Sequence, residues 1–480
     1  MNKKALPLVL IITTFTLCGC PNKTTGDDTK PLTGTIEERL KNLKCVKNVT
    51  SLGSTANFKK VFRMEFIQYI DHENPSKGTF SQHIEVGYNG LNKPTDYVTS
   101  GYSILENNSY YETNENELAF LLNCNYIFVE HRYFDDSLPV AIDPDRKETW
   151  TYLTTKQAAD DAHRIVTQFK RVFEGKWVST GISKGGMTTE LYAYYHPGDM
   201  DLYVPYVAPF CNSFEDMRMI QFLNEEAGNV QYGSETRGAE VRSNVLAFQV
   251  KLIEYESVLA PKFYQAATRS GVELSSYATQ EKLYEASVLE FGIGFWQYGY
   301  SYSSLKECLN MSESSASDLA AKQDAMYSFF TSICGPDDLS LNNEFTPYYI
   351  QAYQELGNYG YDFSYIRNAL PSGVTLSITE EEESDFVWKL VLNEEQRKLP
   401  KKELMCPKIE NMLQTTDQQF IILYGSSDPW YAVRPSDVEG RDNISIYVNT
   451  KHPHTTNVGN YGSKVQKEIL GKIKAALGVE

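Results

Sequence analysis

A serine lies between two glycines in the segment Gly181-Ile182-Ser183-Lys184-Gly185. When such a string joins a strand to a helix, the serine sits on a tight turn and projects its hydroxyl above the sheet. The glycines keep the strand and the helix from clashing, and the backbone N–H of Lys184 lies at the helix start, where it can donate to an oxyanion. The pattern predicts Ser183 as the nucleophile of an acyl transfer. Its alternative is a glycine-rich turn that only packs a helix on a sheet.

A serine nucleophile needs a base and an orienting acid, and in hydrolases with this turn the chain order is Ser, then Asp or Glu, then His. Of the seven histidines, only His452 and His454 come late in the chain, beyond a predicted strand. We favour His454 as the base because it stands nearer to the segment that leads into the last helix, and His452 remains the alternative. Asp428 lies in the segment Gly425-Ser426-Ser427-Asp428 that follows the predicted strand at 419–424, and it is the favoured acid, with Asp437 as its weaker rival.

The pair His452-x-His454 could instead bind a metal ion. No cluster of carboxylates or thiols accompanies it and the sequence has no Cys-x-x-Cys pair, so we predict no metal and no other cofactor. The cysteines beyond the first twenty residues could form disulfides in an exported chain, and Cys308 with Cys334 is the most local pairing. Their alternative is burial as small apolar side chains. These cysteines are Cys45, Cys124, Cys211, Cys308, Cys334 and Cys406.

The residues around these motifs must form a sheet that positions them. Short β-rich runs alternate with helical patterns, which is typical of an α/β fold with a parallel sheet. A long helix is predicted at 154–174, where Thr154 and Gln157 have the spacing of a capping box. Strands are expected at 82–88, 96–100, 126–130, 177–180, 202–208, 419–424 and 444–448, and a closing helix at 463–476.

Between about 213 and 412 helical patterns replace the strands. This change predicts a helical cap inserted into the sheet domain, with helices at 214–226, 241–268, 280–291, 316–332 and 348–355. The predicted fold class is therefore an α/β-hydrolase sheet with an inserted helical cap domain.

The first twenty residues are predicted to be an export signal. A positive start precedes an apolar stretch at 5–17 that is too short to span a bilayer. The stretch ends in Leu17-Cys18-Gly19-Cys20, which resembles a bacterial lipoprotein box in which Cys20 receives lipid and becomes the mature N-terminus. We therefore expect a protein of the cell envelope that a lipid anchors to a bacterial membrane. An ordinary secretory signal is the alternative.

The 480 residues suit one large domain with an insertion. The formal net charge of -17 repels nucleic acid, so we expect no nucleic-acid partner. The predicted organisation is a lipoprotein signal peptide at 1–20, a flexible tether at 21–35, the first part of the hydrolase core at 36–212, the cap at 213–412 and the second part of the core at 413–480.

Four motifs in this order resemble the secreted bacterial tripeptidyl aminopeptidase family and, more distantly, prolyl carboxypeptidase and dipeptidyl peptidase II. The similarity covers most of residues 60–215 and 415–460. The motifs are Glu130-His131-Arg132-Tyr133-Phe134, Gly181-Ile182-Ser183-Lys184-Gly185-Gly186-Met187, Tyr206-Val207-Ala208-Pro209 and Asp428-Pro429-Trp430.

The resemblance implies a serine exopeptidase that trims short peptides by a Ser-Asp-His triad. It implies that Met187 and Trp430 line an apolar pocket for the residue before the scissile bond, with core packing as the alternative for each. It also points to the loop near Tyr102 for a second oxyanion donor. The segment 130–133 is expected to be an ion-paired scaffold under the site.

The sequence departs from the family pattern in two places. Ile182 replaces a frequent glycine, and Lys451-His452-Pro453-His454 replaces a glycine-rich stretch before the histidine. Either change is compatible with altered specificity or partly lost activity. Two other functions therefore stay open: an esterase or acyl hydrolase acting on glycans, and a surface lipoprotein that uses the same fold for binding.

Overall fold

The computed structural model describes residues 30–104, 117–436, 438 and 440–479. Within these residues nine strands form one sheet in the order β1-β2-β3-β5-β4-β6-β7-β10-β11. The pairings from β1 to β5 are antiparallel, and those from β5 to β11 are parallel. The strands are β1 (Val46–Gly53), β2 (Lys60–Tyr69), β3 (Thr79–Tyr88), β4 (Thr95–Thr99), β5 (Asn125–Val129), β6 (Trp177–Ile182), β7 (Leu202–Tyr206), β10 (Phe420–Gly425) and β11 (Ile444–Asn449).

Helices cover both faces of this sheet. Successive residues of a strand point to opposite faces, and in β10 Phe420 and Ile422 pack under α3, α4 and α15, whereas Ile421 and Leu423 pack under α16. Both faces of β10 are therefore buried, as its continuous apolar run requires. The helices of this part are α1 (Ile36–Lys41), α2 (Glu117–Leu122), α3 (Thr155–Phe169), α4 (Lys184–Tyr195), α15 (Cys406–Thr415) and α16 (Ser463–Leu477).

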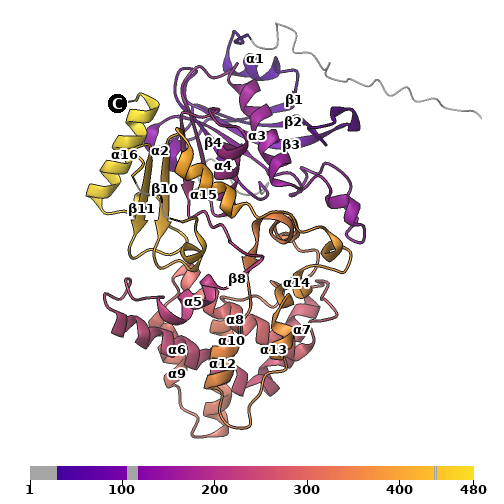
Figure 1. Cartoon of the computed structure of the whole chain (residues 1–480), viewed down its shortest axis with the longest axis vertical. Coiled ribbons are helices and arrows are strands. Elements are labelled where there is room, and N and C mark those ends of the chain that lie inside the picture. The colour runs from indigo at the N-terminus through magenta and orange to yellow at the C-terminus, as the bar shows by residue number, and fades with distance from the viewer. Residues whose placement is uncertain (1–29, 105–116, 437, 439, 480) are drawn as a thin grey trace, which may run out of the picture.

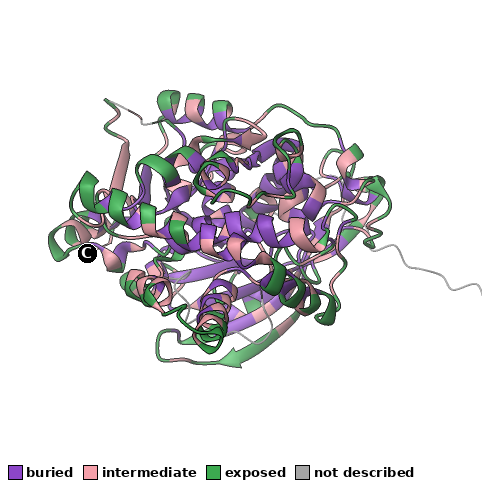
Figure 2. Cartoon of the chain, turned by 90° about the horizontal axis from the view of Figure 1, so that it is seen from below, coloured by how far each residue is buried: buried purple, intermediate pink, exposed green. Residues whose placement is uncertain are grey.

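The chain between β7 and α15 forms a helical cap that lies below the sheet in Figure 1. Its buried side chains form one large apolar cluster, and exposed residues surround it (Figure 2). Two short strands, β8 (Glu215–Asp216) and β9 (Asn358–Tyr359), pair in the cap. Its helices are α5 (Arg218–Glu225), α6 (Glu235–Glu254), α7 (Glu256–Arg269), α8 (Gln280–Tyr298), α9 (Tyr302–Asn310), α10 (Ala316–Thr331), α11 (Thr346–Gln351), α12 (Ser364–Ala369), α13 (Glu380–Glu383) and α14 (Phe386–Val391), joined with short helical turns.

The central cap helix is α8, which is apolar on most of its surface. Thr279 caps its start by accepting from the Lys282 amide, and Gly299 ends it with a φ of 68°. The sequence predicted an end at residue 291, but the helix continues through Gly292, where the side chain of Gln249 from α6 packs closely. A glycine inside a helix is tolerated here because it lets the neighbouring helix approach.

The predicted fold class is confirmed: a largely parallel sheet carries helices on both faces, as in α/β hydrolases. The predicted helix at 241–268 is instead two helices, α6 and α7, that meet at Tyr255. The predicted boundary at residue 412 falls inside α15, which packs against the sheet rather than in the cap. Only half of the predicted capping box forms: Thr154 accepts from the Gln157 amide, while the Gln157 side chain donates to Asp71.

The cysteines among the described residues are all free, so the expected pairing of Cys308 with Cys334 is wrong. Five of the six are buried, as small apolar side chains in a packed interior commonly are. None of the helices in the described part of the chain has the length and apolar character needed to cross a membrane. Cys20 and the predicted signal peptide lie outside the described residues.

Candidate active site

Ser183 lies at the junction of β6 and α4 with a φ of 57° and a ψ of -119°. Its amide donates to the Tyr206 carbonyl oxygen at 2.9 Å, which ties the turn to β7. A Cβ on Gly181 would lie 2.4 Å from the Gly185 carbonyl carbon, and a Cβ on Gly185 would lie 2.3 Å from the Thr99 carbonyl oxygen. Glycine at both positions lets strand, turn and helix approach this closely. The partly exposed serine is thus held in a sparsely populated conformation, which is common at functional sites.

Asp428 and His454 follow β10 and β11, two neighbouring parallel strands. His454 Nδ1 lies 2.6 Å from Asp428 Oδ2, and the two side chains are buried. The second oxygen of Asp428 accepts from the Trp430 amide at 3.0 Å. Because the carboxylate occupies Nδ1, Nε2 is the ring nitrogen left to take a proton from a nucleophile. The structure brings these two predicted residues together at the edge of the sheet where β6 ends in Ser183.

The structure describes one of the two alternative residues, His452 for the base and Asp437 for the acid. The carbonyl oxygen of His452 accepts from the Ser427 amide at 3.1 Å, so this residue supports the backbone of the turn before Asp428. Within the described chain, the Asp428 carboxylate bonds to His454 and Trp430. Asp437 lies outside the described residues.

The cap contacts the histidine loop through α8. The Gln297 carbonyl oxygen near the end of this helix accepts from the His454 amide at 2.9 Å. Trp430 lies in a short helical turn, η7 (Pro429–Val433), with its ring centroid 6.4 Å from His454 and 5.5 Å from Tyr359. Contacts from both the hydrolase core and the cap therefore fix the position of His454. Nothing in the local sequence around Gln297 or Tyr359 indicated these contacts.

The two predicted oxyanion donors lie on adjoining segments. Lys184 begins α4, so its amide belongs to the first turn, where helical N–H groups have no partner within the helix. The Tyr102 amide donates to Ser100 Oγ at 2.9 Å and would have to leave that bond to reach an oxyanion. The Tyr102 loop lies against the elbow, since a Cβ on Gly101 would be 2.6 Å from the Gly185 nitrogen.

The side chain of Lys184 ties this loop to the elbow. Its Nζ donates to the Gly101 carbonyl oxygen at 2.6 Å and lies 5.6 Å and 5.2 Å from the ring centroids of Tyr102 and Phe134. Burial lowers the pKa of Lys184 well below its usual range. A buried amine that bonds a backbone carbonyl acts here as a positioning group for the loop.

The scaffold under the site is partly ion-paired. Arg132 donates from Nε and Nη2 to the two oxygens of Asp161 at 2.6 Å each, and both side chains are buried. Glu130 forms no ion pair within the described part of the chain but accepts from the Ser137 hydroxyl at 2.6 Å, and burial raises the pKa of Glu130 to about 7. Burial, followed by the charge of Lys184, lowers the pKa of His131.

The two residues expected to line a substrate pocket separate in the structure. Met187 is 4% exposed and belongs to the apolar cluster between α4 and the sheet. The closed space it lines with Lys184 and Leu191 has a volume of about 10 Å³, too small for a side chain. Trp430 is partly exposed beside His454. Core packing is thus the role that the structure supports for Met187.

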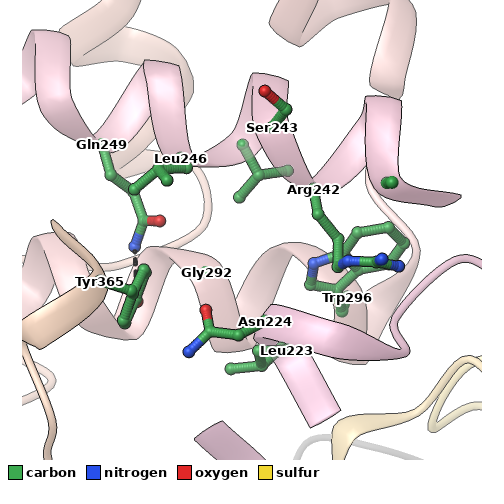
Figure 3. Close-up of a pocket in the computed structure, with 11 residues that line it drawn as sticks. Leu223, Asn224, Arg242, Ser243, Leu246, Gln249, Gly292, Trp296 and Tyr365 are labelled. Carbon is green, nitrogen blue, oxygen red and sulfur yellow. Dashed lines mark hydrogen bonds between the residues drawn. The ribbon is translucent and has the colours of Figure 1, made fainter. Parts of the chain in front are cut away.

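Two larger cavities have no catalytic candidate in their walls. One, of about 380 Å³, lies between the loop after β5 and residues 342–347. The other, of about 260 Å³, lies within the cap, where Arg242 stands beside Trp296 and Gln249 donates to Tyr365 (Figure 3).

A group of three potential metal ligands lies where the middle of α3 meets the end of α4, and it does not include the predicted His452-x-His454 pair. It consists of His163, His196 and Asp199. The two imidazole rings stack almost in parallel at 4.2 Å, so their lone pairs, which lie in the ring planes, do not converge on one point. His163 bonds Asp199 at 2.6 Å and His196 bonds Asp160 at 2.8 Å. The geometry is that of two stacked His–Asp pairs.

Residues 30–473 match the family described as PS-10 peptidase S37. The chain belongs to the PS-10 peptidase S37 family. The S37 chain is also similar to the prolyl tri/tetrapeptidyl aminopeptidase of Streptomyces mobaraensis, with 32% identity over 301 residues. That match covers 61% of this chain and 56% of the relative, so the chain spans little more than half of the relative's length. The resemblance to the tripeptidyl aminopeptidase family found in the sequence is confirmed, and the chain belongs to a peptidase family.

Solved structures with distant likeness to the S37 chain include a proline iminopeptidase of Mycobacterium smegmatis, at 12% identity and a TM-score of 0.36 over 83% of this chain and 95% of that one. An acetyl xylan esterase of Paenibacillus sp. R4 has 10% identity and a TM-score of 0.35 over 94% of this chain and 98% of that one. Likenesses of this size do not distinguish a peptidase from an esterase.

Proposed function

We propose that this S37 peptidase is a serine exopeptidase that removes short peptides from the N-terminus of its substrates. The observation that carries the proposal is the hydrogen bond between His454 and Asp428, beside the strand end that bears Ser183. The family and the name of the Streptomyces relative support a peptide as the substrate.

The proposed reaction passes through an acyl-enzyme. Ser183 Oγ attacks the peptide carbonyl while His454 Nε2 takes its proton, and Asp428 holds the imidazole in the required tautomer. The Lys184 amide stabilises the oxyanion, and His454 then gives the proton to the leaving amine. Water activated by His454 hydrolyses the ester and restores Ser183. No cofactor takes part in these steps.

The cap supports an exopeptidase rather than an endopeptidase. It bonds to the histidine loop through α8, so it leaves less room for a chain that continues past the site in both directions. Trp430 offers an apolar ring beside His454 for the residue before the scissile bond. The name of the relative supports proline at that position.

A digest of an unmodified twelve-residue peptide, read by mass over time, tests this function. We expect short peptides to leave from the N-terminus in sequence, with proline-containing sequences cleaved after proline. Internal fragments would contradict an exopeptidase. Turnover of acetyl or feruloyl esters without any peptide turnover would favour an esterase, and no turnover of either class would favour a binding lipoprotein.

We also propose that Cys20 carries a lipid that anchors the protein to a bacterial membrane, either facing the periplasm or at the surface. The support is the Leu17-Cys18-Gly19-Cys20 string behind a short apolar stretch. In a host with lipoprotein processing, wild type should incorporate labelled palmitate and partition into detergent. Cys20→Ala should do neither. Equal labelling of the two proteins would overturn the anchor.

A further inference from the structure

A carboxylate on α8 is held by two phenols, and no cation among the described residues is its partner. Tyr359 Oη lies 2.8 Å from both oxygens of Glu290, and the hydroxyl of Tyr361 donates to Oε1 at 2.7 Å. The only other charge that acts on Glu290 within the described residues is Asp338. Glu290 is partly buried, and burial raises its pKa to about 7. The two tyrosines therefore orient an acidic group whose charge nothing in the described chain neutralises.

Glu290 lies on the same face of α8 as Gln297, near the end of the helix. Glu290 and Gln297 are seven residues apart, so after almost two turns they lie on one face, about 10 Å apart along the axis. Gln297 is the residue whose carbonyl bonds the His454 amide. The cap helix thus runs from the histidine loop to the carboxylate, and it lies at the core side of the cap in Figure 1.

A second chain of contacts reaches the same carboxylate independently. The Tyr359 ring, whose hydroxyl bonds Glu290, lies 5.5 Å from Trp430. Trp430 in turn lies 6.4 Å from His454. An aromatic surface therefore connects the proposed base with the carboxylate.

We propose that Glu290 binds the α-ammonium group of a peptide whose third residue presents its carbonyl to Ser183. This inference rests on the proposed exopeptidase function. The name of the Streptomyces relative, a tri/tetrapeptidyl aminopeptidase, supports an acyl group of three residues, which spans about 10 Å when extended. Trp430 lies between the two ends, where the side chain before the scissile bond would pack.

The chemistry favours an ammonium over other ligands. A charge-assisted hydrogen bond to a carboxylate is about twice as strong as a neutral one, and a cation would supply the partner that Glu290 lacks. An N-acetylated peptide brings no positive charge and would leave the carboxylate desolvated and unpaired. The enzyme would thereby distinguish a free N-terminus from a blocked one or from the interior of a chain.

The test compares Ala-Ala-Pro-aminomethylcoumarin with its N-acetyl form on wild type and Glu290→Gln. Wild type should prefer the free amine by about 100-fold in kcat/KM, the typical effect of one desolvated charge pair. Glu290→Gln keeps the size and one acceptor oxygen, and it should lose most of that preference while turning over the acetylated substrate at least as fast as wild type does. Asp338→Asn, which removes the neighbouring charge, is the matched control and should keep the preference.

A pH series on wild type gives a second readout that needs no variant. The groups that face Glu290 are Tyr359, Tyr361, Tyr349, Tyr365, Cys334 and Asp338. Burial raises the pKa of each tyrosine and of Cys334, so these stay neutral near pH 7. Because Glu290 is charged above about pH 7 and an α-amine loses its proton near pH 8, the preference for the free amine should peak between these values and fall on either side. Comparing two substrates cancels the titration of the triad.

The inference would be overturned if Glu290→Gln lost kcat/KM equally on both substrates, or if it kept the wild-type preference for the free amine. A preferred release of dipeptides by wild type would overturn the three-residue acyl group of the proposal. Failure of the proposed function looks different: wild type itself would turn over neither substrate and would not react with a fluorophosphonate.

Discussion

Replacing Ser183 by alanine should lower kcat on Ala-Ala-Pro-aminomethylcoumarin by about a millionfold, as loss of a triad serine does in other serine hydrolases. The reason is that no other hydroxyl occupies the turn between β6 and α4. Binding should persist, since the backbone donors and the cap remain. The melting temperature should change by about 2 °C or less, because the substitution removes one partly exposed hydroxyl.

Ser426→Ala is the matched control for this experiment. Ser426 lies two residues before Asp428, and its hydroxyl has no hydrogen-bond partner among the described residues. Its activity should stay within a few-fold of wild type. If Ser183→Ala kept a tenth of the activity, or if it melted far below wild type, Ser183 would be a structural residue of the turn rather than a nucleophile.

Replacing His454 by alanine should be about as damaging as replacing the serine, because base and nucleophile act as one unit. The same change at His452, two residues earlier, should lower kcat/KM by less than about tenfold. The hydrogen bond of His454 to Asp428 supports the first expectation. The second follows because His452 contributes its backbone carbonyl to the Ser427 amide, which alanine retains.

Steady-state kinetics of the two variants with the same coumarin substrate decide between the histidines. Intact folding of each is checked by its thermal unfolding. A millionfold loss in His452→Ala together with an active His454→Ala would reverse the assignment of the base. Comparable moderate losses in both would mean that the loop as a whole, and not one imidazole, matters.

The elbow and the acid could be predicted because their signals are local. Gly181 and Gly185 flank Ser183 in a recognisable pattern, and Asp428 follows within three residues a strand that is buried on both faces. Chain order then left two histidines, and spacing alone could not separate them. His454 meets Asp428 because the loops after β10 and β11 are neighbours in the folded sheet, and the local sequence does not specify how these two loops are arranged.

Other parts of the fold could not be predicted from the sequence, for physical reasons. The strand β1 lies at the edge of the sheet and is mostly exposed, so it carries no apolar alternation to detect. The break at Tyr255 falls at a residue that helices tolerate, without a glycine or proline beside it. Cys308 and Cys334 are near in sequence, but both are free in the structure, where Cys334 belongs to the cap cluster and the partly buried Cys308 packs against it.

The cap residues near the site could not be predicted at all. Glu290 and Tyr359 are 69 positions apart, and they meet only because β9 and its neighbouring residues pack against α8. For Met187 the family resemblance implied a role in a substrate pocket, because this residue comes four positions after the serine. In the structure α4 places its side chain in the apolar cluster between the helix and the sheet.

Reaction with diisopropyl fluorophosphate, followed by peptide mass mapping, tests the central claim most directly. The reagent phosphorylates a serine only where a base and an oxyanion site activate it. We predict one adduct per chain, located on Ser183, and none on Ser183→Ala or on His454→Ala. An unmodified wild type, or an adduct on another residue that persists in Ser183→Ala, would contradict the claim that Ser183 is the nucleophile of this peptidase.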